Sequence, residues 1–305
     1  MPARLIINAD DFGLTAGINR SIAELHDAGA ISSATLMADG SEFRDAVDIA
    51  KARPNLSVGC HIVLVDGIPI SAPEDIPTLI GADGKSFRVS LIEFVIDALL
   101  GRIRETDVLR EAAAQVQKLQ RAGIDITHLD THKHTHLFPV IARPLLHVAE
   151  RCSIGAVRNP FEQPWSMQGG ILRQLQVHAL RYFRSQFFSL PQIRSGVVTT
   201  TEGTIGISAT GDLNAATLAH ILASMPEGTW ELVCHPGYND EDLELVPTRL
   251  REERNIERLA LLDAAPQKFS QPNPPQLIHY GQLGVYSAKR ELGQYIPPTG
   301  YEKVL

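Results

Sequence analysis

The sequence predicts an α/β fold, an irregular TIM-barrel-like β/α barrel with parallel strands. Short apolar segments alternate with amphipathic helical segments along most of the 305 residues, and this alternation is typical of a parallel sheet. No glycine-rich dinucleotide fingerprint follows the first apolar segment, which disfavours an open nucleotide-binding sheet. Polar residues also follow several different apolar segments, as they do at the C-terminal ends of barrel strands. We therefore expect the functional residues at those strand ends.

Length and composition fit one large domain. A barrel needs around 250 residues, so we expect a single barrel domain over residues 1–285 and a C-terminal tail over residues 286–305. Hydrophobic residues make up 44% of the chain and charged residues 21%, which is ordinary for a globular protein. The net charge is −7, with no block of lysine or arginine. This charge argues against a dedicated nucleic-acid binder.

Cysteine content and hydropathy predict a cytoplasmic protein. The chain has three cysteines and no CxxC pair, and an odd number does not suggest a disulfide framework. The N-terminus leads directly into the first predicted strand, so we expect no signal peptide. No apolar stretch approaches the ~20 residues of a membrane-spanning helix. A homodimer is the default expectation for the oligomeric state.

The first 64 residues predict three strands joined by two helices. Each strand is a short apolar run, and each helix repeats its apolar residues at helical spacing. Gly29 is a suitable C-cap for the first helix, and Pro54 ends the second. The predicted strands span residues 5–7, 33–38 and 56–64, and the predicted helices span residues 16–28 and 43–53.

A segment rich in proline and glycine follows the third predicted strand. Residues 66–87 contain three prolines and three glycines, and a connection this long is usually functional. Residues 90–122 then form the longest helical pattern of the chain. We expect two helices there, with a break near Gly101.

The second half of the chain continues the alternation of strands and helices. The predicted strands span residues 125–130, 156–158, 204–208 and 230–234, and the predicted helices span residues 139–151, 213–225 and 248–264. Residues 165–200 contain helical sequence but no clear motif. Their aromatic residues are expected in the core, and an apolar rim that docks on a membrane surface is the alternative. The candidates are Trp165, Phe183, Phe187 and Phe188.

Two adjacent carboxylates follow the first predicted strand. Asp10 and Asp11 repel each other unless a cation or a proton separates them. One of them can bind a metal while the other acts as a base, whereas the alternative is an ordinary turn before a helix. Neighbours on a strand point to opposite faces. This orientation disfavours a retaining glycosidase, whose two carboxylates lie about 5 Å apart across the sugar.

Histidines gather at the later strands. His61 lies within a strand, where a buried core histidine is the alternative to a metal ligand. Asp130 ends the next strand, and His132, His134 and His136 follow at a spacing of two residues. This spacing favours at least one metal ligand among the three. Two histidines and one carboxylate form a common catalytic set for a divalent metal ion.

Two further residues complete a plausible hydrolytic site. His235 follows the last predicted strand and precedes Pro-Gly, so it either begins a turn or protonates a leaving group. Arg158 ends the short strand over residues 156–158 and either faces solvent or pairs with Asp10 and tunes its basicity. A carboxylate beside a metal can deprotonate a metal-bound water, whose pKa the metal lowers. The set therefore predicts metal-assisted hydrolysis.

Four ordered motifs resemble those of the YdjC-like carbohydrate deacetylases. They are residues 8–13 (NADDFG), 59–61 (GCH), 128–132 (HLDTH) and 234–237 (CHPG), and the likeness extends from residue 4 to about residue 285. The resemblance implies a TIM-barrel-like fold and removal of an acetyl group from an N-acetylated amino sugar. It also implies that Asp11, His61 and His132 hold one divalent metal ion, with Asp10 as general base and His235 as general acid. The expected supporting or substrate-binding residues are Asp130, His134, His136 and Arg158.

The resemblance leaves alternatives for the metal, its ligands and the substrate. Family members are usually described with Mg²⁺, whereas two imidazoles suit Zn²⁺ better. More distant polysaccharide deacetylases take both imidazoles from one His-x-x-x-His, the spacing of His132 and His136, although the YdjC-like pattern favours His61. Residues 63–77 resemble the deacetylases associated with hopanoid biosynthesis, which implies an N-acetylglucosaminyl glycolipid. A chitooligosaccharide deacetylase of the diacetylchitobiose type and a sugar-binding barrel without catalysis are the alternatives.

Overall fold

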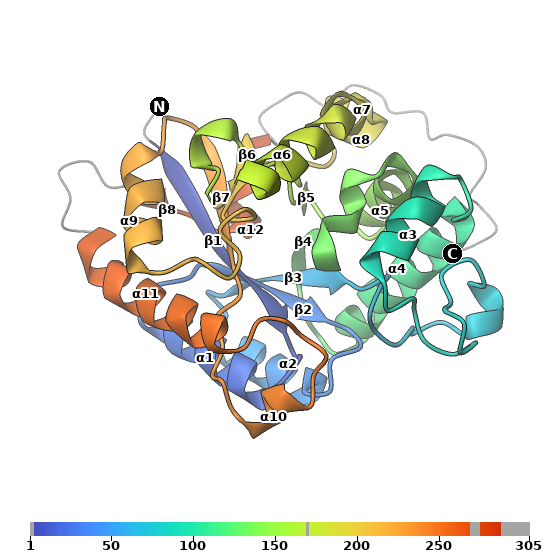
Figure 1. Cartoon of the computed structure of the whole chain (residues 1–305), viewed down its shortest axis with the longest axis horizontal. Coiled ribbons are helices and arrows are strands. Elements are labelled where there is room, and N and C mark those ends of the chain that lie inside the picture. Colours follow the sequence, from blue (N-terminus) through green and yellow to red (C-terminus); the bar gives the residue numbers. More distant parts are fainter. Residues whose placement is uncertain (1–2, 169–170, 269–274, 288–305) are drawn as a thin grey trace.

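The computed structural model describes residues 3–168, 171–268 and 275–287. Within these residues, one sheet of parallel strands occupies the centre and helices surround it (Figure 1). The sheet follows the order β5-β4-β3-β2-β1-β7-β6, and β8 pairs with the start of β1. The strands are β1 (Arg4–Phe12), β2 (Ser33–Met37), β3 (Ser57–Ile62), β4 (Ile126–Thr131), β5 (Ala156–Val157), β6 (Gly203–Ile205), β7 (Thr229–Cys234) and β8 (Gln276–Leu277).

Isolated bridges bring the two ends of the sheet together. Ala156 in β5 bridges Thr199, and Glu162, which follows β5, bridges Thr204 in β6; both bridges are parallel. The sheet therefore curls into an incomplete barrel, which confirms the predicted TIM-barrel-like α/β fold. Each of the seven predicted strands overlaps one of β1 to β7.

Helices follow most of the strands. They are α1 (Ala16–Asp27), α2 (Phe43–Ala52), α3 (Leu91–Leu99), α4 (Glu105–Arg121), α5 (Pro139–Arg151), α6 (Ile171–Leu180), α7 (Arg184–Ser189), α8 (Pro191–Arg194), α9 (Ala215–Ser224), α10 (Glu241–Glu244), α11 (Glu252–Lys268) and α12 (Tyr280–Ser287), with 3₁₀ turns η1 (Pro73–Asp75), η2 (His132–Leu137), η3 (Pro164–Ser166) and η4 (Arg181–Phe183). The sequence did not predict β8 and α12. The predicted tail, residues 286–305, lies outside the described residues from 288 onward.

Alternation along the strands separates the core from the barrel interior. In β3, Cys60 and Ile62 belong to the hydrophobic core, whereas His61 lies between them and points to the opposite face. Cys234 in β7 is likewise buried in the core. Both cysteines therefore pack as the alternation predicts, and the polar residue of β3 is directed toward the interior.

The long loop over residues 66–87 is held against α4. Buried Glu111 accepts hydrogen bonds from the backbone N–H groups of Ile70 and Ser71, both at 2.9 Å. Asp107 accepts a further bond from the backbone N–H of Thr78 at 3.0 Å. Carboxylates that accept backbone N–H groups form strong, directional bonds. The loop therefore has a defined conformation although its regular structure is limited to the short turn η1 and one antiparallel bridge between Ile80 and Phe87.

Trp165, Phe183, Phe187 and Phe188 pack inward, whereas Tyr182 of the same segment is exposed. Phe187 is buried, with its ring centroid 5.7 Å from that of Phe161. The ring of Trp165 lies 5.2 Å from that of Trp230. The expectation of core packing is therefore correct, and these residues do not form an exposed rim. None of the helices in the described ranges combines the length and apolar character that a membrane crossing requires.

Candidate active site

The end of β1 directs two neighbouring carboxylates to the same side. Asp11 has a φ of 64°, and the register of β1 against β2 shifts between Ala9 and Phe12. Such a bulge changes the direction of a side chain. As a result, Asp10 and Asp11 each have an oxygen within 4.8 Å of a ring nitrogen of His61. The expectation that the two aspartates point to opposite faces is wrong, because it assumed a regular strand.

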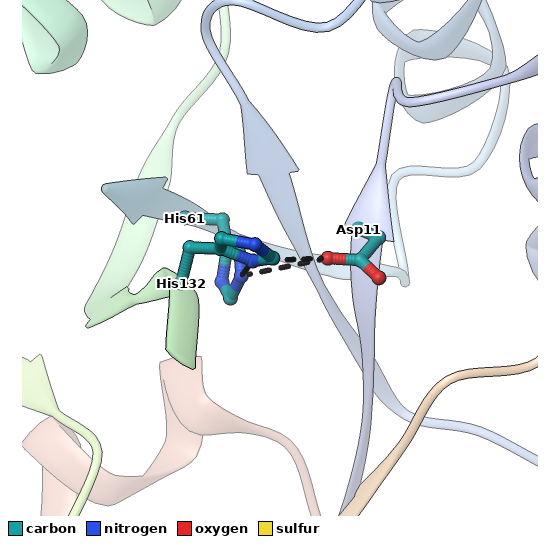
Figure 2. A group of neighbouring side chains, drawn as sticks. All are labelled: Asp11, His61 and His132. Atoms are coloured by element: carbon teal, nitrogen blue, oxygen red, sulfur yellow. Dashed lines mark hydrogen bonds and ion pairs between the residues drawn. The ribbon is translucent and has the colours of Figure 1, made fainter. Parts of the chain in front are cut away.

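Asp11, His61 and His132 converge from three different strand ends (Figure 2). Oδ1 of Asp11 lies 3.7 Å from Nε2 of His61 and 3.5 Å from Nδ1 of His132. This oxygen is buried and has no hydrogen-bond partner among the described residues. One carboxylate oxygen and two imidazole nitrogens around a common point are a donor set that fits a divalent metal ion. The group can therefore bind a metal.

Asp130 orients the imidazole of His61. Nδ1 of His61 and Oδ1 of Asp130 are 2.7 Å apart, so Nδ1–H donates to the carboxylate and Nε2 is left facing Asp11. Such carboxylate partners fix the tautomer of metal-binding histidines. Burial would lower the pKa of His61, but Asp130, Asp10 and Asp11 raise it to about 9. The carboxylates around His61 therefore favour a positive charge on its ring or next to it.

A backbone kink separates the three histidines after β4. Lys133 and His134 have left-handed conformations, with φ values of 56° and 53°. The ring of His132 turns toward Asp11, and His134 lines the cavity. His136 turns away, because its Nε2 donates to the carbonyl of Arg158 at 3.2 Å. Of the two alternatives for the second imidazole, it is His61 that lies beside Asp11 and His132.

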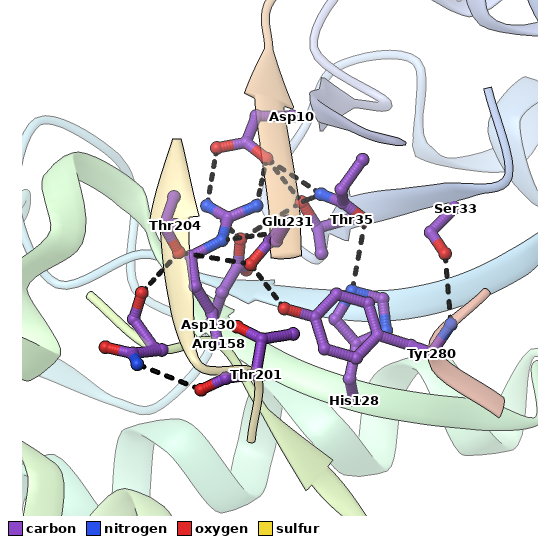
Figure 3. Close-up of polar contacts among 12 residues, drawn as sticks. Asp10, Ser33, Thr35, His128, Asp130, Arg158, Thr201, Thr204, Glu231 and Tyr280 are labelled. Atoms are coloured by element: carbon purple, nitrogen blue, oxygen red, sulfur yellow. Dashed lines mark hydrogen bonds and ion pairs between the residues drawn. The ribbon is translucent and has the colours of Figure 1, made fainter. Parts of the chain in front are cut away.

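Arg158 is fully buried among three carboxylates (Figure 3). Its Nη1 and Nη2 donate to Oδ2 and Oδ1 of Asp10 at 2.8 and 2.6 Å. Nη1 also lies 2.6 Å from Asp130, and Nε donates to Glu231 at 2.8 Å. Burial would raise the pKa of Asp10, but the Arg158 guanidinium holds it well below its usual value. The expected ion pair between Arg158 and Asp10 is thus present, and Asp10 is ionised.

Glu231 and Tyr280 extend the network of hydrogen bonds and ion pairs around Arg158. The hydroxyl of Tyr280, in α12, donates to Glu231. Burial raises the pKa of Glu231 to about 7, although Arg158 opposes the shift. Tyr280 also stacks on His128, with ring centroids 3.7 Å apart. A Cβ on Gly59 would lie 2.5 Å from the His128 ring, so the glycine leaves room for this stack. In the sequence, the one indication of this network is Glu231 itself, a charged residue within the apolar strand WELVC.

Helix α11 contributes two buried charged residues that the sequence did not reveal. Nη2 of Arg254 donates to Oδ2 of Asp11 at 2.6 Å. Oε2 of Glu257 accepts the backbone N–H of His235 at 2.6 Å. Nε2 of His235 lies 3.9 Å from Oδ2 of Asp10. Burial lowers the pKa of His235 to about 4 despite the nearby carboxylates. Charged residues on an amphipathic helix are usually solvated, which explains why these two were missed.

A cavity of about 1190 Å³ opens above these residues. Its lining combines buried and half-buried polar residues with exposed apolar residues. The polar residues include Asp10, Asp11, Asp39, His61, Asp66, His132, Lys133, His134 and His235, and the exposed apolar residues include Ile68, Val89 and Leu245. Asp39 was not among the predicted residues. The cavity is larger than most small-ligand sites, which measure about 300–1,000 Å³.

Comparison with known proteins assigns the family. The model of the family described as YdjC-like protein matches residues 4–271. The chain belongs to the YdjC-like family. This YdjC-like chain is 31% identical to the carbohydrate deacetylase of Brevibacillus brevis, over 92% of this chain and 100% of that protein. It is 26% identical to the carbohydrate deacetylase of Thermoanaerobacter pseudethanolicus, over 92% of this chain and 98% of the relative. The predicted family is therefore confirmed.

A solved structure supports the fold of this YdjC-like chain. The crystal structure of a protein from Enterococcus faecalis superposes with a TM-score of 0.71 at 22% identity and covers 93% of this chain and 100% of that chain. At this level of identity, the similarity concerns the fold alone. It agrees with the curled parallel sheet and its surrounding helices.

Proposed function

We propose that this YdjC-like chain is a metal-dependent carbohydrate deacetylase that hydrolyses the acetamide of an N-acetylated amino sugar. The main support is Oδ1 of Asp11, which accepts no hydrogen bond from the described residues and faces ring nitrogens of His61 and His132. These three residues would hold one Mg²⁺ or Zn²⁺. When bound, the metal supplies a Lewis acid for the acetamide carbonyl and lowers the pKa of water. Acetate and a free amino sugar are the products.

Asp10 and His235 are the groups that we propose to move protons. Arg158 keeps Asp10 ionised and fixes both of its oxygens, so Asp10 can accept the proton of the attacking water as general base. His235 lies 3.9 Å from Asp10. Because its pKa is lowered to about 4, His235 is neutral at pH 7 and must first take up a proton, such as the one that Asp10 removes from water. His235 can then deliver this proton to the nitrogen of the departing amine as general acid. Asp130 holds the His61 ring in place, and His134 faces the cavity where substrate would bind.

Acetate release tests this function. The substrates are N-acetylglucosamine, diacetylchitobiose and an N-acetylglucosaminyl lipid, each with and without a chelator. Chelator-sensitive release is the expected result. No release together with bound metal, shown by elemental analysis, would favour the sugar-binding barrel without catalysis. No release and no metal would contradict the whole arrangement.

For the substrate, we propose a glycolipid, as the hopanoid-associated resemblance implies. The cavity lining and helix α3 both expose large aliphatic side chains, and exposed apolar patches usually mark interaction sites. Ile68 and Val89 are 66% and 72% exposed and also line the cavity. On α3 and its end, the exposed residues Ile92, Ile96, Leu99 and Leu100 follow at helical spacing. An apolar aglycone could rest on these aliphatic side chains while the sugar reaches the polar residues of the cavity.

A matched pair of glycosides separates the glycolipid from a chitooligosaccharide. The octyl and methyl β-glycosides of N-acetylglucosamine differ only in apolar length. A glycolipid site should give the octyl glycoside a KM lower by about tenfold or more, because each buried methylene contributes about 0.8 kcal/mol. Ile92→Ser should reduce this preference, whereas Leu259→Ser, which changes an exposed residue of α11, should not. Equal KM values with better turnover of diacetylchitobiose would favour the chitooligosaccharide.

We also propose a cytoplasmic homodimer built from one barrel domain over residues 1–285. Within the described residues, Cys60, Cys152 and Cys234 form no disulfide, and Cys60 and Cys234 are buried, which agrees with a reducing compartment. The pairing of β8 with β1 supports one domain that reaches the C-terminal part of the described chain. Analytical ultracentrifugation tests the dimer, and a concentration-independent monomer would contradict it.

A further inference from the structure

Asp39 is a carboxylate of the catalytic cavity that the proposed mechanism does not use. It follows β2 by two residues and lines the cavity wall. Met37, the last residue of β2, pairs in register with His61 of β3. The chain beyond β2 therefore runs close to the proposed metal group. Asp39 therefore lies beside the space in which a substrate would react.

The two oxygens of Asp39 have different surroundings. Oδ2 accepts the backbone N–H of Ile68 at 3.2 Å. A Cβ on Gly67 would lie only 2.4 Å from this oxygen, so the glycine leaves space for the carboxylate. Oδ1 is buried and, within the described ranges, accepts no hydrogen bond. Buried polar atoms without a partner are rare and costly, so Oδ1 calls for a donor that arrives with a ligand.

Neighbouring groups in the described parts of the chain do not supply that donor. Lys133 lies in the same wall, but its Nζ is bound to Asp66 at 2.7 Å. In the described part of the chain, the groups whose spacing suits a metal ion do not include Asp39. A donor can therefore come from water or from a substrate in the cavity. Resting on the proposed function, the ligand is an amino sugar, and its hydroxyl groups are hydrogen-bond donors that a carboxylate accepts.

We infer that Oδ1 of Asp39 accepts a hydrogen bond from one sugar hydroxyl and so positions the ring whose acetamide reacts at the metal group. Asp39 is thus a specificity-determining residue. It selects substrates that carry a hydroxyl at one ring position, while Ile68 holds the carboxylate through its other oxygen. Recognition by a buried charged acceptor is strong, because the analogue that lacks the donor leaves the carboxylate unpaired.

Deoxy sugars test this inference. The substrates are methyl N-acetyl-β-glucosaminide and its 3-, 4- and 6-deoxy analogues, and the proteins are wild type, Asp39→Ala and Asp39→Asn. In wild type, one deoxy analogue should lose kcat/KM by about 10- to 100-fold, the range for a hydrogen bond to a charged group. Asp39→Ala should lose a similar factor on the parent sugar and nothing more on that analogue. Asp27→Ala, which changes a carboxylate outside the cavity that already has Arg53 as partner, should leave the wild-type pattern unchanged.

The outcomes separate this inference from the proposed function. Equal losses on all four sugars in Asp39→Ala, or no loss at all, would overturn it. If Asp39→Ala is unfolded by circular dichroism, Asp39→Asn decides, because its side-chain carbonyl can still accept the N–H of Ile68. If wild type releases no acetate, the proposed function fails, and calorimetric binding of the same four sugars decides about Asp39. Tighter binding of the parent sugar than of one analogue, lost in the variants, supports the inference, whereas equal or absent binding overturns it.

Discussion

The two neighbouring aspartates at the end of β1 have contrasting surroundings. Arg158 binds both oxygens of Asp10 at 2.8 and 2.6 Å, and the side chain of Asn8 donates to the same carboxylate. Arg254 binds only Oδ2 of Asp11, at 2.6 Å. Oδ1 of Asp11 has no hydrogen-bond partner among the residues that the structure describes. The Asp10 side is therefore saturated with donors, and the Asp11 side is not.

This difference teaches how adjacent, identical residues can take different tasks. The Asp10 carboxylate is fixed before any ligand arrives, which is the preorganisation that a catalytic base requires. The Asp11 carboxylate keeps one oxygen for a further positive partner, and the adjacent imidazoles supply two more donors. Under the proposed function, the first side holds the base and the second side holds the metal.

Removing a proposed metal ligand should have the largest effect on activity. We expect Asp11→Asn and His132→Ala to lose bound metal and activity together. The metal contributes several kcal/mol to the transition state, so kcat/KM should fall by about a thousandfold or more. Elemental analysis and acetate release measure the two losses. His134→Gln is the matched control, because His134 lines the cavity outside the Asp11 group and should keep the metal.

Asp10→Asn should separate the two sides of the site. The variant keeps Asp11, His61 and His132, so metal content should stay near the wild-type value. Turnover should fall by about 10²- to 10⁴-fold, the usual contribution of a general base. Acetate release and elemental analysis on the same preparation check both statements. Turnover at the wild-type rate would remove Asp10 as the base, and loss of metal would show that the two aspartates act as one unit.

The two arginines should differ in stability and in rescue by metal. Arg158→Met leaves Asp10, Asp130 and Glu231 buried without their guanidinium, and breaking a buried ion pair costs about 3–5 kcal/mol. Arg254→Met should cost less, because a metal at Asp11 can replace the lost positive charge. Urea denaturation with Zn²⁺, with Mg²⁺ and with chelator measures both. Equal costs and equal rescue by metal would erase the distinction between the two sides.

The sequence predicted the residues at strand ends because topology alone places them. Parallel strands bring their C-terminal ends to one rim, so Asp10, Asp11, His61, His132 and His235 could be grouped without knowing any distance. The orientation of Asp11 could not be predicted. It depends on the bulge in β1, and a regular strand would have sent the two aspartates to opposite faces.

The supporting residues were hidden for a different reason. Glu231 is a single charged residue in an apolar strand, and Arg254 and Glu257 belong to a helix with many charges. Local patterns predict such helix charges in solvent. Their burial results from the packing of α11 and α12 around the barrel, which is a tertiary effect. Asp39 follows β2 by the same logic as the other strand-end residues, but no neighbouring motif drew attention to it.

Replacing Glu257 should have the smallest effect on the protein, and this change tests the α11 side of the site. Burial raises its pKa to about 7, although the N–H of His235 and the charge of Arg254 lower it. The folded protein therefore retains a proton at Glu257 between the ordinary pKa of 4.5 and about 7, where the unfolded chain has released it. The contribution of Glu257 to stability thus decreases as the pH rises through this window.

Glu257→Gln removes this proton uptake and keeps the shape of the side chain. From about pH 5 to pH 8, the free energy of unfolding of wild type should fall relative to the variant by on the order of 2–3 kcal/mol. The depressed pKa of His235, about 4, affects both proteins and cancels in the difference. Urea denaturation across this range measures it, with Glu253→Gln as control, since the pKa of Glu253 is lowered and its titration lies below the window. A difference that stays constant with pH would mean that Glu257 is ionised in the folded protein, and the α11 side of the site would then be as fully charged as the Asp10 side.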